Sequence, residues 1–332
     1  MAKFDPVSYR LYLKNSIISG KNRHILVEGK DDKYLIERLW EDFKTYKNCD
    51  RNIKIIVDSA ENLIQGDESV SLPENIEKVK FIANSINGKE YSDRFIGFVD
   101  RELNNFEWNY EEHAELRDRI ESHQIIQRLI LSRGHSIENY VFELPIIDEV
   151  LEYISTTAYA NQAIKLFRQS FPMTLRIACS LGLAAAKAEA LSRSRNTIDR
   201  NLIEIVSSTE PQIVFKFDEW LEKLVRRNIT ATQAQDLRKH YNIYNEKVAN
   251  ASFPLVRWIC HGHISYDCLR ALYEKCIVEI CPIEQDRDKE LSGISWIAKD
   301  KLLYNFINAW IKRSLQRQCD YPLAIFELLG VN

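Results

Sequence analysis

A glutamate and two aspartates follow a short apolar segment near the start of the chain, in the sequence ILVEGKDD. Glu28 ends the segment, and Gly29 suits a sharp turn from a strand into a helix. Asp32 lies four residues after Glu28, which is one helical turn away if the helix begins there. Its carboxylate could therefore reach the same place, whereas Asp31 is expected to cap or charge the first helical turn.

A second pair of carboxylates, Asp100 and Glu102, follows a later apolar segment in the sequence GFVDREL. Ligands bind at the carboxyl ends of the strands in a parallel α/β sheet. If the two apolar segments are neighbouring strands, Glu28 and this pair converge on one edge of the sheet. Such a cluster is costly because like charges raise each other's pKa, and a divalent cation removes that cost. Arg101, between the pair, should point away toward the surface or a partner.

These oxygen donors favour Mg²⁺ as the cofactor, with Mn²⁺ as the alternative. Mg²⁺ takes one or two protein carboxylates per ion and keeps water or substrate phosphates as its other ligands. The predicted metal ligands are Glu28, Asp32, Asp100 and Glu102. Two ions about 3.5 to 4 Å apart could stabilise the attacking and leaving oxygens of a phosphodiester, and a single ion is the alternative. An ordinary strand end and helix start, without metal, would use the same residue types.

The sequence HSIENY, residues 135–140, supplies further catalytic candidates. Glu138 could act in acid–base chemistry or add an oxygen ligand, with Asn139 as a positioning amide. His135, together with Arg133, could bind a phosphate or a leaving group. The alternative is a simple helix start, in which Ser136 caps the helix and Asn139 bonds the backbone.

The apolar segments of the first part of the chain predict a parallel sheet. They are rich in Ile, Val, Leu and Phe, are apolar throughout and alternate with amphipathic helices, which is typical of a sheet covered on both faces. We expect strands at residues 24–28, 53–57, 94–99 and 127–132. The expected fold class is therefore α/β, with a first domain over residues 1–145.

Helical periodicity dominates after Pro145. Long segments of this kind lie at residues 217–227, 230–249 and 296–313, with no convincing strand among them. We therefore expect an all-helical second domain over residues 146–332. Cys260, His261, His263 and Cys268 lie close together in it, but their spacing does not match a structural zinc site.

Composition and charge restrict the class of protein. With 332 residues, 45% of them hydrophobic, the chain can bury a substantial core. It has no long uncharged apolar stretch and no apolar signal segment at its start, so we expect a cytoplasmic protein without a membrane span. Residues 1–150 carry 21 Lys and Arg against 28 Asp and Glu, whereas 151–332 carry 24 against 20. The acidic first part suits a cation site, and the second could approach a polyanion. The candidates for phosphate contacts are residues 192–200 and the pairs Arg226–Arg227 and Lys312–Arg313, and a solvated polar helix face is the alternative for each.

ILVEGKDD, followed about seventy residues later by GFVDREL, resembles the Toprim fold of primases, topoisomerases and overcoming-lysogenization-defect nucleases. The signature of that fold is a strand-end Glu-Gly and a later Asp-x-Asp. With LSRGHSIENYVF at residues 131–142, the sequence is similar to a Toprim-like nuclease family found beside ABC-type ATPases in bacterial anti-phage loci, such as PARIS-type defence systems. The resemblance covers residues 20–145 and implies a Toprim-like parallel sheet flanked by helices.

The resemblance also implies roles for individual residues. Glu28 matches the glutamate of acid–base chemistry or metal binding, and Asp100 matches the first aspartate of Asp-x-Asp. Asp32 matches an acidic position of the nuclease branch. Glu102 stands where the second aspartate is usual, and its extra methylene loosens the geometry expected for a second ion.

The family implies a toxic, Mg-dependent endonuclease that acts on RNA, with tRNA as the expected substrate, in abortive infection. An ABC-type ATPase sensor would hold it inactive until infection, and release would permit a homodimer. The chain has no GxxxxGK[ST] loop, so any such ATP-dependent sensing needs a partner. The alternatives are a DNA nuclease of the overcoming-lysogenization-defect type and a non-catalytic adaptor that docks on an ATPase.

Overall fold

The computed structural model describes residues 5–20, 22–50, 52–64, 72–112, 115–207, 210–297, 299–315 and 324–331. It divides into two compact units. The first consists of Met1–Arg101, Ile120–Arg133 and Ile307–Asn332, and the second of Glu102–Arg119 and Gly134–Phe306. The two units are thus interleaved along the chain, whereas the sequence predicts a single boundary at residue 145.

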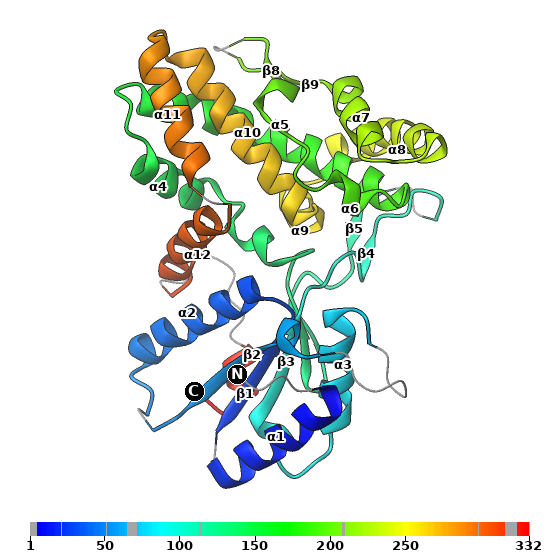
Figure 1. The fold of residues 1–332 in the computed structure, drawn as a ribbon, viewed down its shortest axis with the longest axis vertical. Coiled ribbons are helices and arrows are strands. Elements are labelled where there is room, and N and C mark those ends of the chain that lie inside the picture. The colour runs from blue at the N-terminus through cyan, green and yellow to red at the C-terminus, as the bar shows by residue number, and fades with distance from the viewer. Residues whose placement is uncertain are drawn as a thin grey trace. The chain divides into compact units, whose positions relative to one another are not determined.

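The first unit is built on a five-stranded sheet with the order β2-β1-β3-β7-β6 (Figure 1). The strands are β1 (Arg23–Val27), β2 (Ile55–Ser59), β3 (Phe95–Val99), β6 (Gln124–Ile126) and β7 (Leu129–Leu131). All neighbours pair in parallel except β6, which pairs with β7 in the antiparallel direction. The prediction of a mixed α/β fold with a mostly parallel sheet is confirmed, and β6 is an additional antiparallel edge strand.

Helices cover both faces of this sheet. They are α1 (Pro6–Gly20), α2 (Lys30–Lys47) and α3 (Asn75–Ile86), with short 3₁₀ turns η1 (Ala60–Asn62) and η2 (Ser92–Arg94). In Figure 1, α1 and α3 lie on one side of the sheet and α2 on the other. A Cβ on Gly97 of β3 would lie 2.9 Å from Val79 of α3, so glycine permits the close approach of helix and strand. The central strands β1 and β3 are almost entirely buried, which explains their continuous apolar sequence.

The C-terminal residues return to the first unit through α13 (Ala324–Glu327). Phe326 stacks on Phe43 of α2 with ring centroids 4.8 Å apart. The Nε atom of Arg23 donates to the carbonyl of Leu329 at 2.7 Å. These contacts place residues that are distant in sequence around one sheet.

The second unit is mainly helical. Its helices are α4 (Leu144–Ile154), α5 (Ala160–Lys187), α6 (Leu191–Ser194), α7 (Phe217–Arg226), α8 (Ala231–Asn250), α9 (Phe253–Ile259), α10 (Gly262–Ile280) and α11 (Glu284–Trp296), with 3₁₀ turns η3 (Ile137–Val141) and η4 (Arg200–Leu202). Helix α12 (Lys299–Leu315) spans residues of both units. The long helices α5 and α10 pack against each other. Gly182 of α5 lies where a Cβ would come within 2.9 Å of His261, so small residues allow this packing.

A small antiparallel sheet corrects the expectation of an all-helical second domain over residues 146–332, and another small sheet lies before that segment. Strand β8 (Ile203–Ile205) pairs with β9 (Ile213–Phe215), and β4 (Phe106–Glu107) pairs with β5 (Arg117–Asp118). These strands are only two or three residues long, too short to give a recognisable alternation of apolar and polar residues. The segment 146–332 therefore contains a hairpin that the sequence pattern does not reveal.

Two further features concern the cysteines and the membrane. Six cysteines are buried and form no disulfide, whereas Cys319 lies outside the described residues. In the described part of the chain, no helix is both long and apolar enough to cross a membrane.

Candidate functional site

Glu28 and Asp100 meet at the carboxyl edge of the sheet. Glu28 directly follows β1 and Asp100 directly follows β3, and the two strands are parallel neighbours. The Oε1 atom of Glu28 accepts a hydrogen bond from the backbone N–H of Asp100 at 2.7 Å. Both residues are half-buried. The structure therefore brings together these two predicted site residues, as the strand-end argument requires.

Asp32 is held in the first turn of α2. Its Oδ2 atom accepts a hydrogen bond from the backbone N–H of Gly29 at 2.9 Å, and the residue is buried. This contact caps the helix start, a role that the sequence pattern assigns to Asp31. Asp32 therefore makes a structural contact, and it lies in the same strand-to-helix connection as Glu28.

The sequence expectation for Arg101 is wrong. Arg101 is fully buried in the first unit rather than placed at the surface. Its backbone N–H donates to Ser132 Oγ at 2.9 Å, and its guanidinium donates to the carbonyl of Arg133 at 3.1 Å. The reason is that β3 and β7 are neighbours, so the segments that follow them run side by side and bind the side chain.

Glu102 belongs to the second unit and is exposed. Its backbone has φ 51°, in the left-handed region, and its N–H donates to the carbonyl of His135 at 2.7 Å. The role of Glu102 as a metal ligand stays a prediction from the sequence.

The donors at the sheet edge suit Mg²⁺ chemically. Glu28, Asp32 and Asp100 offer only oxygen, and Mg²⁺ needs one or two carboxylates when water or substrate completes its coordination. One oxygen of Glu28 and one of Asp32 already accept backbone hydrogen bonds, which fixes the orientation of both groups. Within the described ranges, no three or more His, Cys, Asp or Glu side chains are grouped so that they could hold a metal ion. The same finding covers Cys260, His261, His263 and Cys268.

The motif HSIENY lies against the motif CHGH of the second unit, more than a hundred residues later. The backbone N–H of His135 donates to the carbonyl of Trp258 at 2.7 Å. The side-chain Nδ2 of Asn139 donates to the carbonyls of Arg257 and Cys260, at 2.6 and 2.9 Å. Its Oδ1 also accepts from the N–H of Ser136 at 2.7 Å, which confirms the expectation that Asn139 bonds the backbone.

Glu138 and His263 form a buried carboxylate–imidazole pair in this arrangement. Glu138 is 5% exposed, and its Oε1 lies 3.0 Å from Nδ1 of His263. Burial opposes the ionisation of Glu138, but hydrogen bonds from His263 and Ser136 hold its pKa well below its usual range. The carboxylate is therefore charged, and the charge is directed at His263.

Gly262 allows this close approach. A Cβ at position 262 would overlap both the Ser136 hydroxyl and the Glu138 carboxylate. The Glu138 carboxylate consequently lies against the first turn of α10, where the helix dipole favours a negative charge. Gly262, which directly precedes His263, is a sequence signal that could have indicated a close contact with a distant group.

His135 and His261 are buried beside the pair, with ring centroids 4.9 Å apart. Burial lowers the pKa of His135 to about 4 and that of His261 well below its usual value, so both rings are neutral at pH 7. His261 caps α10 by accepting a hydrogen bond from the N–H of Ile264. A neutral His135 does not supply the positive charge that binding a phosphate would use.

The first unit also contains a buried polar network that the sequence does not reveal. The fully buried ring of His24 lies 3.4 Å from Asp58 through Nδ1 and 2.8 Å from Ser16 through Nε2. The Tyr9 hydroxyl donates to Asp58 at 2.6 Å. Burial opposes the ionisation of Asp58, yet hydrogen bonds from His24 and Tyr9 lower its pKa. These groups satisfy one another, as expected for a structural network.

Comparison with known proteins adds no further assignment. No model of a known protein family matches the sequence, and no relative is found among curated proteins. The assignment of a function therefore depends on the geometry of these residues and on the resemblance of the motifs.

Proposed function

We propose that the protein is a metal-dependent nuclease whose catalytic carboxylates are Glu28 and Asp100. The hydrogen bond between Glu28 Oε1 and the Asp100 N–H carries this proposal, because it places both groups at the carboxyl ends of adjacent parallel strands. Ligand sites of parallel α/β sheets lie at that edge. Asp32 lies in the helix turn that follows and is the third candidate of the same unit.

The carboxylates would hold Mg²⁺, or Mn²⁺ in its place, through Glu28, Asp100 and Asp32, with Glu102 kept as a predicted ligand. When bound, the ion would supply charge stabilisation for cleavage of a phosphodiester. The chain itself contributes orientation, because the Asp100 N–H fixes the Glu28 carboxylate and the Gly29 N–H fixes Asp32. Preorganised groups of this kind need no rearrangement as the reaction proceeds.

The resemblance of ILVEGKDD, GFVDREL and HSIENY to the Toprim-like defence nucleases supports a more specific proposal. The substrate is RNA, with tRNA as the expected target, and cleavage makes the protein toxic to the infected cell. An ABC-type ATPase sensor restrains it until infection, and the released chain acts in the cytoplasm as a homodimer.

Purified full-length protein incubated with Mg²⁺ or Mn²⁺ tests the activity on total tRNA and on plasmid DNA in parallel. We expect cleavage of tRNA that EDTA abolishes. Glu28→Gln and Asp100→Asn should each lower the rate by about 100-fold or more, because each removes an anionic ligand of the proposed metal ion. Glu37→Gln is the matched control, since Glu37 is an exposed carboxylate of the same unit that pairs with Lys33.

Cleavage of DNA alone would replace the RNA substrate with the alternative of a DNA nuclease. Expression in cells tests the adaptor alternative. If Glu28→Gln remained fully toxic while its rate in vitro fell, the toxicity would not arise from this centre and the enzymatic role would be wrong.

A further inference from the structure

We propose that the second unit carries a phosphate-binding site, formed by His263 and Arg195, that takes the backbone of a nucleic-acid strand. The site deepens the proposed nuclease function, because it gives the second unit a contact with the same substrate. The identity of the ligand rests on that proposed function, whereas the contacts that define the site do not depend on it.

His263 is oriented toward solvent by its contact with Glu138. The residue lies in the first turn of α10, and its side chain is 40% exposed. Its Nδ1 atom is engaged by the buried Glu138 carboxylate, so Nε2 is the nitrogen that can contact a ligand. A buried carboxylate that holds one ring nitrogen fixes the tautomer and the orientation of the other. Glu138 is thus a positioning residue.

Arg195 lies beside the same face of α10. The N–H of Asn196, the next residue, donates to Asp267 Oδ2 at 2.9 Å. Asp267 is one helical turn after His263 and therefore shares its face of the helix. Burial is the main reason that the pKa values of His135 and His261 are lowered, and the charges of His263 and Arg195 act in the same direction.

The arginines around this position are not neutralised by carboxylates. The Arg227 guanidinium donates to the carbonyls of Arg195 and Asn196 at 2.7 and 2.9 Å, and Arg193 donates to the carbonyl of Arg227. In the described part of the chain, none of Arg193, Arg195 and Arg227 forms an ion pair with Asp or Glu. All three are exposed. Their combined charge suits a phosphate, for which arginine is a preferred donor.

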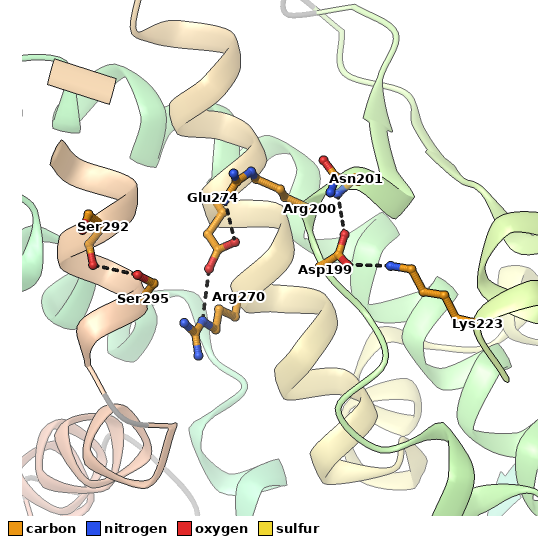
Figure 2. Close-up of polar contacts among 8 residues, drawn as sticks. All are labelled: Asp199, Arg200, Asn201, Lys223, Arg270, Glu274, Ser292 and Ser295. Carbon is orange, nitrogen blue, oxygen red and sulfur yellow. Dashed lines mark hydrogen bonds and ion pairs between the residues drawn. The ribbon is translucent and has the colours of Figure 1, made fainter. Parts of the chain in front are cut away.

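Figure 2 shows the opposite situation on a neighbouring part of the same unit. There Glu274 lies 3.1 Å from Arg270 and 3.6 Å from Arg200. Lys223 pairs with Asp199 at 2.5 Å. The positive charges of these side chains are compensated within the protein, so the uncompensated group around Arg195 is a local feature of the surface.

His135 supplies an independent indication of a polar partner. Its Nδ1 atom is buried and has no hydrogen-bond partner among the residues that the structure describes. Buried polar atoms nearly always have a partner in the protein, in ordered water or in a ligand. The His135 ring lies beside that of His261, with ring centroids 4.9 Å apart, at the same end of α10.

Binding of a fluorescein-labelled oligoribonucleotide, measured by anisotropy in EDTA over a range of salt concentrations, tests the site in the full-length protein. Arg195→Ala and His263→Gln should each weaken binding about tenfold. Arg195→Ala should also reduce the slope of log affinity against log salt concentration by about 0.7, the value for one lost phosphate contact on a single strand. Arg168→Ala is the matched control, because Arg168 is an arginine of the same unit that pairs with Asp148 and Glu152. Arg168→Ala should change neither the affinity nor the salt slope.

Two substitutions test separately whether the charge and the length of the Glu138 side chain are needed. Glu138→Asp keeps the carboxylate and should retain most of the affinity, whereas Glu138→Gln should lose as much affinity as His263→Gln. Circular dichroism confirms that each variant is folded. Equal affinities of the two Glu138 variants would remove its positioning role, and with it the orientation of His263.

The proposed phosphate-binding site would be contradicted if the wild-type protein did not bind RNA. It would also be contradicted if the Arg195, His263 and Arg168 variants bound RNA equally well. A parallel incubation with Mg²⁺ separates this result from the nuclease activity. Binding that depends on Arg195 without any cleavage supports the phosphate site and removes the proposed nuclease. Cleavage of RNA together with unchanged binding by the variants supports the proposed nuclease and removes the phosphate site.

Discussion

The Glu28 carboxylate accepts a hydrogen bond from the backbone of Asp100, 72 positions later in the chain. The backbone of Asp100 therefore orients the Glu28 carboxylate, and this needs no contact between the two carboxylates. The bond joins the ends of two neighbouring strands, so a change at Glu28 affects both the sheet edge and the proposed metal site.

Two substitutions at Glu28 should separate these effects. Glu28→Gln keeps an oxygen that can accept from the Asp100 N–H, so we expect near wild-type stability with the activity lost. Glu28→Ala removes the acceptor and should lower the free energy of unfolding by about 1 kcal/mol as well. Urea denaturation monitored by circular dichroism, together with the tRNA assay, measures the two effects. Equal stability of both variants would show that the bond contributes nothing measurable.

Gly262→Ala should destabilise the second unit. The added methyl group would overlap Ser136 and Glu138, and overpacking of this kind costs about 1–3 kcal/mol. Gly293→Ala in α11 is the control, because a Cβ at that position would have no atom within 4 Å. Alanine has a higher helix propensity than glycine, so Gly293→Ala should raise the free energy of unfolding by about 0.5–1 kcal/mol. Thermal denaturation compares them, and a stable Gly262→Ala protein would contradict the close approach.

Arg101→Ala should cost far more than loss of an exposed arginine. Arg101 is fully buried and donates to the carbonyl of Arg133. Its removal leaves a cavity and an unpaired acceptor, for which we expect a loss on the order of 2–4 kcal/mol. Arg38→Ala, which removes an i,i+4 pair with Asp42 on α2, should change the free energy of unfolding by about 0.5 kcal/mol or less. Similar values for both would be inconsistent with the buried position.

His135 should make stability depend on pH. Its pKa is about 4 in the folded protein, below the ordinary value of about 6.5, because burial disfavours the charged ring. The unfolded chain therefore binds the proton first, so stability is fully present above pH 6.5 and falls as the pH is lowered toward 4. The expected slope is on the order of 1.4 kcal/mol per pH unit.

The comparison is with His135→Asn, which cannot titrate in this range. Urea denaturation at intervals between pH 7 and pH 4 gives the slope for each protein. The variant should show the shallower dependence, and identical slopes would mean that His135 is charged or exposed in the folded protein.

The strands of the first unit could be predicted because β1 and β3 are buried on both faces and are therefore apolar throughout. The convergence of Glu28 and Asp100 follows from the same reasoning, since strand ends of a parallel sheet share an edge. Hairpin β8–β9 could not be predicted, because three-residue strands leave no periodic signal. The sequence pattern of the second domain accordingly predicts helices alone.

The contact between Glu138 and His263 lay beyond sequence reasoning for another reason. It depends on how η3 packs against the start of α10, which no local pattern encodes. Gly262 is a sequence trace of this contact, because a Cβ there would lie 2.4 Å from the Glu138 carboxylate. Gly134 marks a second close approach, since a Cβ on it would lie 2.8 Å from Trp258 of α9.

The return of the C-terminal residues has a consequence for the order of folding during synthesis. Arg23 bonds the carbonyl of Leu329, which the ribosome adds 306 positions later. The second unit must therefore have been translated before the first can complete its packing, and contacts so distant in sequence slow folding. The unit that carries Glu28 and Asp100 thus completes its packing only after Leu329 has been translated, which would delay the proposed nuclease activity until that point.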